Sequence, residues 1–114
     1  TPEINKEVVL NYDHQRLSAF DAIFTHEENS LRCPVKSEVC KEISSHLIHT
    51  LNRYCEWAAR YINPQNEKLI ILIDLITTQT STKLNLLKQI WQNHSHILIL
   101  NHVELQRWLS NVNE

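Results

Sequence analysis

The sequence predicts a single all-α domain, an irregular bundle of about five helices built on one long central helix. Three observations favour this fold class. Apolar residues recur at steps of three and four along much of the chain. Glycine, which most readily supplies the positive φ of tight β-turns, is absent from all 114 residues. The hydrophobic fraction of 42% is that of an ordinary globular chain, so one core can form. We expect residues 1–114 to be one helical domain.

The first expected helix runs roughly from Lys6 to His26. Its apolar residues are separated by seven, three and four positions, which places them on one helical face: Leu10, Leu17, Phe20 and Phe24. The polar run from His26 to Ser30 interrupts this pattern and predicts a loop.

The second expected helix is the long one, from Pro34 to Ile62. Pro34 suits the first turn, where a missing N–H costs nothing. The pair Asn63-Pro64 ends the helix, because the residue before a proline is displaced from the α region. The apolar stripe is continuous over this range: Val35, Val39, Ile43, Leu47, Leu51, Tyr54, Ala58 and Ile62.

The remaining segments combine clear helices with ambiguous apolar runs. Residues 68–76 and Ile97–Leu100 are apolar on every side, so periodicity does not separate a buried helix from a buried strand. Between them lies a helical stripe that Thr80 or Ser81 can cap: Leu84, Leu87, Ile90 or Trp91, and His94. A short final helix is expected at Val103–Val112, with an apolar face of Leu105, Trp108, Leu109 and Val112.

An α/β architecture is the alternative fold. In it, residues 69–75 and 97–100 form a small parallel sheet, joined by a helical crossover. Two short strands do not make a stable sheet, however, and the first 62 residues show no third strand signal. The all-helical bundle is therefore favoured.

Composition excludes several classes of function. Without glycine, P-loops, dinucleotide-binding fingerprints and nucleophile elbows cannot form in their usual way. The net charge of −2 and the absence of a basic stripe argue against nucleic acid as a partner. The longest uncharged apolar run, Leu69–Ile73, is far too short to span a membrane.

The cysteine and methionine content predicts where the protein is located and whether the chain is part of a larger protein. Three cysteines cannot all pair within the chain, which favours reduced thiols and an intracellular location, cytoplasmic or nuclear. Methionine is absent, including an initiator, which indicates a domain excised from a larger protein.

Histidines are the first candidates for a metal site. His94, His96 and His102 cluster near the end of the chain, but no cysteine pair has the spacing of a structural zinc site. His94-x-His96 suits a metal only if Ile97–Leu100 is a strand and both rings face the same way. We therefore expect no metal and no cofactor.

Two further residues are candidates for chemistry. Cys33 precedes Pro34 at an expected helix start, but we interpret it as an ordinary buried thiol. Asp74 stands alone in the most apolar run. If that run is a strand, Asp74 lies near its carboxyl end, where α/β enzymes place acidic groups. No second carboxylate matches it, so no catalytic residue is predicted.

Two short segments resemble the ligand-binding domain of nuclear receptors. Glu56-Trp57-Ala58-Ala59-Arg60 is similar to that family's helix-3 motif, and Leu86-Leu87-Lys88-Gln89-Ile90-Trp91 to its helix-5 motif. The resemblance implies a helical domain that binds a small molecule. The interval between the motifs is longer than in that family.

The predicted function is a non-catalytic protein–protein interaction or scaffold module of a larger intracellular protein. Such a module binds a partner helix or peptide segment on an exposed face. Leu105 and Trp108 are the candidate partner-binding residues, because tryptophan is enriched at interface hot spots. Trp57 and Trp91 are expected in the core. The alternative is an α/β enzyme fragment or a small-molecule-binding domain with Asp74 at a strand end.

Overall fold

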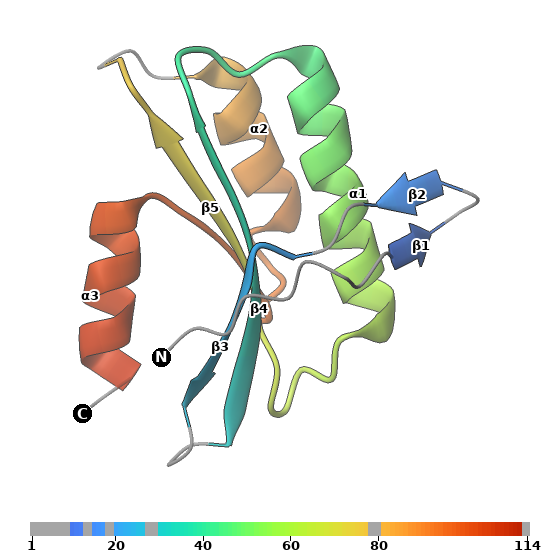
Figure 1. Ribbon diagram of the computed structural model, residues 1–114, viewed down its shortest axis with the longest axis vertical. Coiled ribbons are helices and arrows are strands. Elements are labelled where there is room, and N and C mark those ends of the chain that lie inside the picture. Colours follow the sequence, from blue (N-terminus) through green and yellow to red (C-terminus); the bar gives the residue numbers. More distant parts are fainter. Residues whose placement is uncertain (1–9, 13–14, 18–19, 27–29, 78–80, 113–114) are drawn as a thin grey trace.

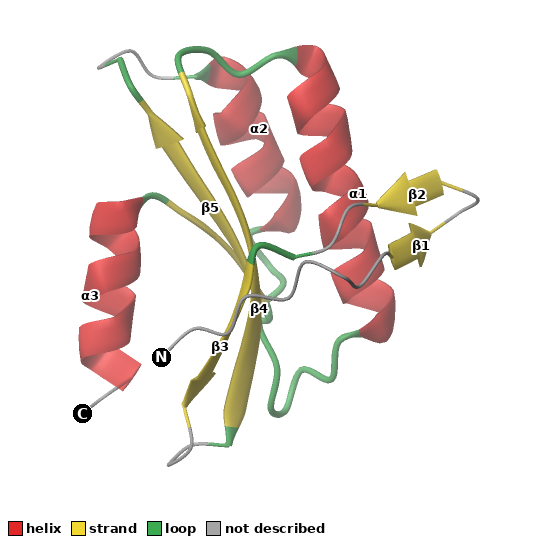
Figure 2. Ribbon diagram, viewed as in Figure 1, coloured by secondary structure: helices red, strands yellow, loops and turns green. Residues whose placement is uncertain are grey.

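The computed structural model describes residues 10–12, 15–17, 20–26, 30–77 and 81–112. These form a mixed four-stranded sheet, a small separate hairpin and three helices (Figures 1 and 2). The fold is therefore α/β, and the prediction of an all-α bundle is wrong. The elements in chain order are β1 (Leu10–Tyr12), β2 (Gln15–Leu17), β3 (Ala22–His26), β4 (Leu31–Cys40), α1 (Ser45–Tyr61), β5 (Leu69–Leu75), α2 (Thr82–Trp91), β6 (Ile97–Leu100) and α3 (His102–Val112).

The main sheet has the order β3-β4-β5-β6. β3 and β4 are antiparallel, whereas β4, β5 and β6 run parallel, with Val35 opposite Ile70 and Ile70 opposite Leu98. Helix α1 connects β4 to β5, and α2 connects β5 to β6. Figure 2 shows α1 and α2 on one side of the sheet and α3 on the other. The carboxyl ends of the three parallel strands consequently meet at one edge of the sheet.

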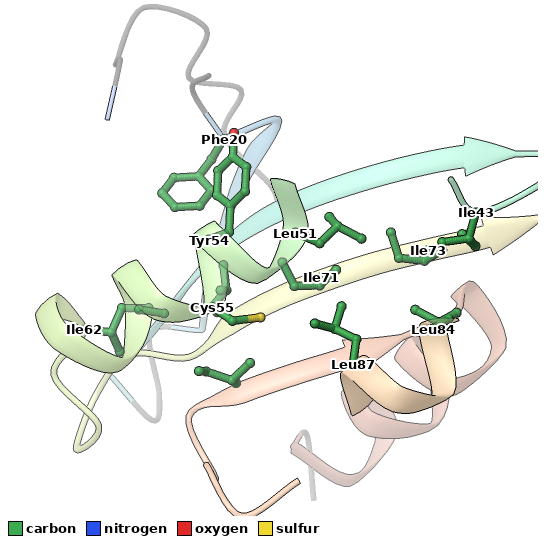
Figure 3. Close-up of a cluster of buried hydrophobic side chains, with 13 residues drawn as sticks. Phe20, Ile43, Leu51, Tyr54, Cys55, Ile62, Ile71, Ile73, Leu84 and Leu87 are labelled. Atoms are coloured by element: carbon green, nitrogen blue, oxygen red, sulfur yellow. The ribbon is translucent and has the colours of Figure 1, made fainter. Parts of the chain in front are cut away.

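The core lies between the sheet and the helices α1 and α2 (Figure 3). Leu69, Ile71 and Ile73 alternate along β5 and point into it, because successive side chains of a strand face opposite sides. Helix α1 contributes Leu51, Tyr54, Cys55 and Ala58, and α2 contributes Leu84 and Leu87. Each large apolar side chain buried here stabilises the fold by about 1.5–3 kcal/mol. Ile70, Leu72 and Asp74 face the opposite side of the sheet, toward α3.

The expected long central helix is two elements. Val35 and Val39 lie in β4, and the helix α1 begins only after Ser44, whose Oγ accepts a hydrogen bond from the Leu47 amide at 3.0 Å. A spacing of four residues is even, so it places two side chains on one face of a strand as well as on one face of a helix. The apolar stripe through this region was therefore compatible with both structures.

The expected helix at residues 6–26 is also wrong. The described residues of this range include β1, β2 and β3. In β3, each residue from Ala22 to His26 pairs with a residue of β4, from Val35 back to Leu31, which defines this segment as a strand. Phe20 does reach the core, where its ring lies 5.7 Å from the ring of Tyr54. Residues 27–29 of the expected polar loop lie outside the described residues, and Ser30 has a φ of 51°.

The alternative fold is confirmed in its central part. β5 and β6 have the bounds expected for the two parallel strands, 69–75 and 97–100. The other two strands of the sheet are β4 and β3. Helices were expected over these residues, because the spacing of their apolar side chains is also that of a helix. The helix expected between the two strands is confirmed as α2, with Ser81 as its cap, and the helix expected at Val103–Val112 is confirmed as α3. The two receptor-like motifs lie on α1 and α2, but β5 separates them, so the helical domain implied by that resemblance is wrong.

None of the helices in the described residues could cross a lipid bilayer, because none is both long and apolar enough. The longest, α1, has 17 residues and carries charged and polar side chains along one face. About 20 predominantly apolar residues are needed to span the hydrocarbon core.

Candidate functional site

The segments that follow the carboxyl ends of β5 and β6 leave toward opposite faces of the sheet. After β5 the chain turns to α2 on one side of the sheet, and after β6 it turns directly into α3 on the other side (Figure 1). In open α/β sheets, neighbouring connections that diverge in this way leave a crevice outside the strand ends, where ligands bind. This edge is therefore the first candidate position for a ligand site.

A hollow of about 300 Å³ occupies this position. Its lining comes from the end of β5 and the segment after it, from α2, from Asn101 directly after β6 and from the start of α3, and consists of Ile73, Asp74, Leu75, Thr77, Ser81, Leu84, Asn85, Lys88, Asn101, His102 and Val103. Lys88 of α2 and His102 of α3 both line it, and Lys88 Nζ also lies 3.9 Å from Oε1 of Glu104, a residue outside the lining. The hollow thus brings together ionisable groups from both sides of the sheet.

Asp74 and His102 form the closest polar pair in this hollow. The ring nitrogen Nδ1 of His102 lies 2.6 Å from Asp74 Oδ1, and the backbone N–H of His102 donates to the same oxygen at 3.1 Å. The side chain of Asp74 is 24% exposed, whereas that of His102 is 68% exposed. The carboxylate is therefore partly sheltered, and the imidazole extends from it toward solvent.

Local sequence explains why the two groups meet. Asp74 follows Ile73 on β5, so it faces the side of the sheet that α3 covers. Asn101 caps α3: its Oδ1 accepts from the Glu104 amide at 2.8 Å, and Glu104 Oε1 accepts from the Asn101 amide at 3.0 Å. This reciprocal cap fixes the first turn. His102 is then the first residue of α3, beside the end of β5.

The pair has the geometry of an oriented general base. With Nδ1 hydrogen-bonded to a carboxylate, Nε2 of His102 is left to exchange a proton or to bind a ligand. The hydrogen bond from the His102 ring holds the pKa of the Asp74 carboxyl below its ordinary value, against the opposing effect of burial. Asp74 is therefore ionised at neutral pH and favours the tautomer with hydrogen on Nδ1. This arrangement can position a ligand or transfer a proton.

A second hollow, of about 430 Å³, continues along the same edge toward β4. It shares Leu75, Thr77 and Ser81 with the first, so the two form one crevice. Its full lining is Lys41, Glu42, Ile43, Leu75, Thr77, Ser81, Thr82 and Lys83. Two lysines and one glutamate give it a positive formal charge, and it lies at the start of α2, where backbone N–H groups favour anions.

His94 and His96 lie at the other end of β6, away from the crevice. Their ring centroids are 5.5 Å apart, and the His94 ring is 4.9 Å from that of Trp91. Burial, together with the nearby His94 and Lys68, lowers the pKa of His96. Within the described residues, no group of three or more His, Cys, Asp or Glu side chains could hold a metal ion. The three clustered histidines of the sequence therefore separate into a pair and a single residue.

The cysteines are placed for packing. Cys33 is buried in β4 and does not lie at a helix start, and burial raises the pKa of its thiol to about 11. Cys55 is buried in α1, with a pKa raised by burial to about 12. Cys40 is half-buried at the end of β4. All three thiols are free, and none lies among the residues of the crevice.

The predicted partner-binding residues lie on the sheet-facing side of α3. Leu105 and Trp108 are both half-buried, with Glu104 and Leu109, whereas the other residues from His102 to Asn111 are exposed. Helix α3 contacts β5 and β6, so this stripe packs the helix on the sheet. Trp57 and Trp91, which were expected in the core, are half-buried and pack against its edge. Neither Leu105 nor Trp108 lines the crevice.

Asp74 was a candidate from the sequence, whereas its partner His102 was not. His102 comes two residues after an apolar run, just as Asp74 comes at the end of another, and parallel strands bring such ends together. That signal was available once both runs were read as strands. Lys41 and Lys83, in contrast, carry no pattern that marks them. No protein-family model, curated protein or solved structure matches the chain.

Proposed function

We propose that this domain binds a small anionic molecule, such as a phosphorylated or carboxylated metabolite, in the crevice at the carboxyl ends of β4, β5 and β6. The observation that carries the proposal is the divergence of α2 and α3 around a hollow that contains the Asp74–His102 pair. This is where open α/β sheets bind their ligands. The sequence-based alternative, a small-molecule-binding α/β domain with Asp74 at a strand end, is thus preferred to the interaction module.

The charges of the lining favour an anion. Lys41 and Lys83 face the larger hollow with Glu42 as its single acid, although the whole chain has a net charge of −2. Ser81 and Thr82 line the same hollow, and their hydroxyl groups can supply hydrogen-bond donors. A local excess of cations on an acidic chain concentrates anionic ligands at that place.

The Asp74–His102 pair fixes the other end of the ligand. Nε2 of His102 can donate to or accept from a polar group that enters the smaller hollow. Asp74 holds the ring through Nδ1, so the imidazole is oriented before the ligand arrives. An anionic group near the lysines and a polar group near His102 would span both hollows.

The test is a titration of the isotopically labelled protein with inorganic phosphate and then with a panel of phosphorylated and carboxylated metabolites, followed by backbone amide NMR. We expect saturable shifts at Thr77, Ser81, Lys83 and His102. Lys83→Gln should weaken binding about tenfold, since losing one charge-assisted hydrogen bond costs about 1.5 kcal/mol.

Arg107→Gln provides the matched control. Arg107 is exposed on α3 and does not line either hollow, and the substitution changes the net charge by the same amount. It should leave the affinity unchanged. Equal losses in the two variants would show a general charge effect and contradict the site, as would the absence of shifts with every probe.

We also infer that the chain works inside the cell. Three free thiols support this location, because two of them are fully buried and none pairs with another.

A further inference from the structure

We propose that His94 and His96 form a binding site for a divalent metal ion of the Zn²⁺ type, with water in the remaining coordination positions. The site lies before β6, at the opposite end of the parallel strands from the anion crevice, and is independent of it. His94 is half-buried in the turn after α2, and His96 is half-buried directly before β6.

The separation of the two rings fits a shared ion. Two imidazoles that bind one Zn²⁺ through bonds of about 2.0–2.1 Å at a tetrahedral angle place their ring centroids about 5 Å apart. The observed separation is 5.5 Å. Ile97–Leu100 is a strand, and the two rings meet edge to face at an interplanar angle of 72°, so the separation of the ring centroids is the observation that carries the site.

The backbone of the turn is already held in place. Each of its three carbonyl groups accepts a hydrogen bond: that of His94 from the Ile97 amide at 3.1 Å, that of Ser95 from Lys68 Nζ at 2.8 Å, and that of His96 from the Leu69 amide at 2.8 Å. The backbone that carries the two histidines is therefore already ordered before an ion binds. Preorganised ligands bind more tightly, because less conformational entropy is lost.

Trp91 supports one ligand and provides a reporter. Its ring packs on that of His94 with centroids 4.9 Å apart, and its Nε1 donates to Asn52 Oδ1 on α1 at 2.8 Å. The hydrogen bond thus anchors the indole of Trp91 to α1, and the same indole packs against the imidazole of His94. A paramagnetic ion bound by His94 would lie close enough to quench the fluorescence of Trp91.

Two ligands define the class of ion. Imidazole nitrogen is a preferred ligand of Zn²⁺, Ni²⁺ and Cu²⁺, whereas Ca²⁺ and Mg²⁺ require oxygen ligands. Two protein ligands leave open positions, as in metal sites that hold water or a further molecule. We therefore expect exchangeable binding of Zn²⁺ and Ni²⁺ and none of Mg²⁺.

The experiment is a Zn²⁺ titration of the full chain, followed by NMR of the histidine ring nitrogens. The expected result is one ion per chain, with shifts in the rings of His94 and His96. Ni²⁺, which does not oxidise the free thiols, should quench tryptophan fluorescence with the same stoichiometry. His94→Asn and His96→Asn should each weaken binding about 10–100-fold, because even groups outside the ligand shell contribute that much.

A double variant, His46→Asn with His49→Asn, is the matched control. These two histidines are exposed on the first turns of α1, and they are also a closely spaced pair. Removing them should leave the Ni²⁺ quenching unchanged. Wild-type affinity in His94→Asn or His96→Asn, or ring shifts confined to other histidines, would overturn the proposal. The ring spectra of the unaltered chain decide the question even if a variant does not fold.

Discussion

One carboxylate oxygen, Oδ1 of Asp74, accepts hydrogen bonds from both the ring Nδ1 and the backbone N–H of His102. The two residues are 28 positions apart in sequence. This single atom joins the end of β5 to the first residue of α3, and it also interacts favourably with the positive end of that helix. The pair consequently serves the stability of the fold as well as the proposed site.

Acid should weaken this connection. The folded-state pKa of Asp74 lies below its ordinary value of 3.8, so its contribution to stability is present above pH 3.8 and is lost as the pH falls through the folded pKa. Asp74→Asn removes this contribution at all pH values. The free energy of unfolding, measured in urea at pH 6 and pH 3, should therefore fall less between the two in Asp74→Asn than in the wild type. Equal falls would contradict the link.

Ser30 is a position where substitution should stabilise the fold. Its φ of 51° lies in the left-handed region, which is unfavourable for a residue with a Cβ atom. Asparagine tolerates this region better than serine. Ser30→Asn should therefore raise the free energy of unfolding by about 0.5 kcal/mol. Ser30→Ala, which keeps the Cβ atom and has no such preference, should bring no gain in the same urea experiment.

Trp108→Ala should destabilise the domain, because the half-buried indole packs α3 on the sheet. We expect a loss of about 1–3 kcal/mol, below the range for a fully buried tryptophan. Gln106→Ala, on the exposed face of the same helix, should change stability by less than about 0.5 kcal/mol. Chemical unfolding measures both. An unchanged stability for Trp108→Ala would return this residue to its sequence-based role in binding a partner.

The three thiols should differ in reactivity. Thiolate is the reactive form, and burial raises the pKa of Cys33 to about 11 and that of Cys55 to about 12. Cys40 is half-buried, so it should react first with a thiol reagent at pH 8. We expect one fast thiol in the folded protein and all three in guanidinium. Cys40→Ser should remove the fast phase, and a fast phase that persists would contradict the burial of the other two.

The sequence predicted the bounds of several elements well, even where it left open whether the element was a helix or a strand. Residues 69–75 and 97–100 have the bounds expected if they are strands, and α2 begins after its expected cap, Ser81. The all-α interpretation failed at Val35 and Val39, because their spacing suits a strand and a helix equally. Without β4, the segments 69–75 and 97–100 would form a sheet of only two short strands, so the α/β fold was not favoured.

The candidate site was predictable only in part. Asp74 was recognisable as a lone acid at a possible strand end, but His102 became its partner only through the parallel pairing of β5 with β6. That pairing is a tertiary property, since 28 residues and a whole helix separate the two side chains. Lys41 follows β4 and Lys83 lies in α2, and local sequence does not indicate that these two lysines line the same hollow.

The absence of glycine affects the unfolded chain as much as the folded one. A chain of average composition has about 7% glycine, and replacing a glycine by alanine at a compatible site stabilises a protein by about 0.4–1 kcal/mol through a smaller unfolded-state entropy. Within the described residues, only Ser30 needs a positive φ. Nearly all of these turns are therefore compatible with side chains, and the unfolded ensemble of this domain is narrower than usual, which favours folding by several kcal/mol without any native contact.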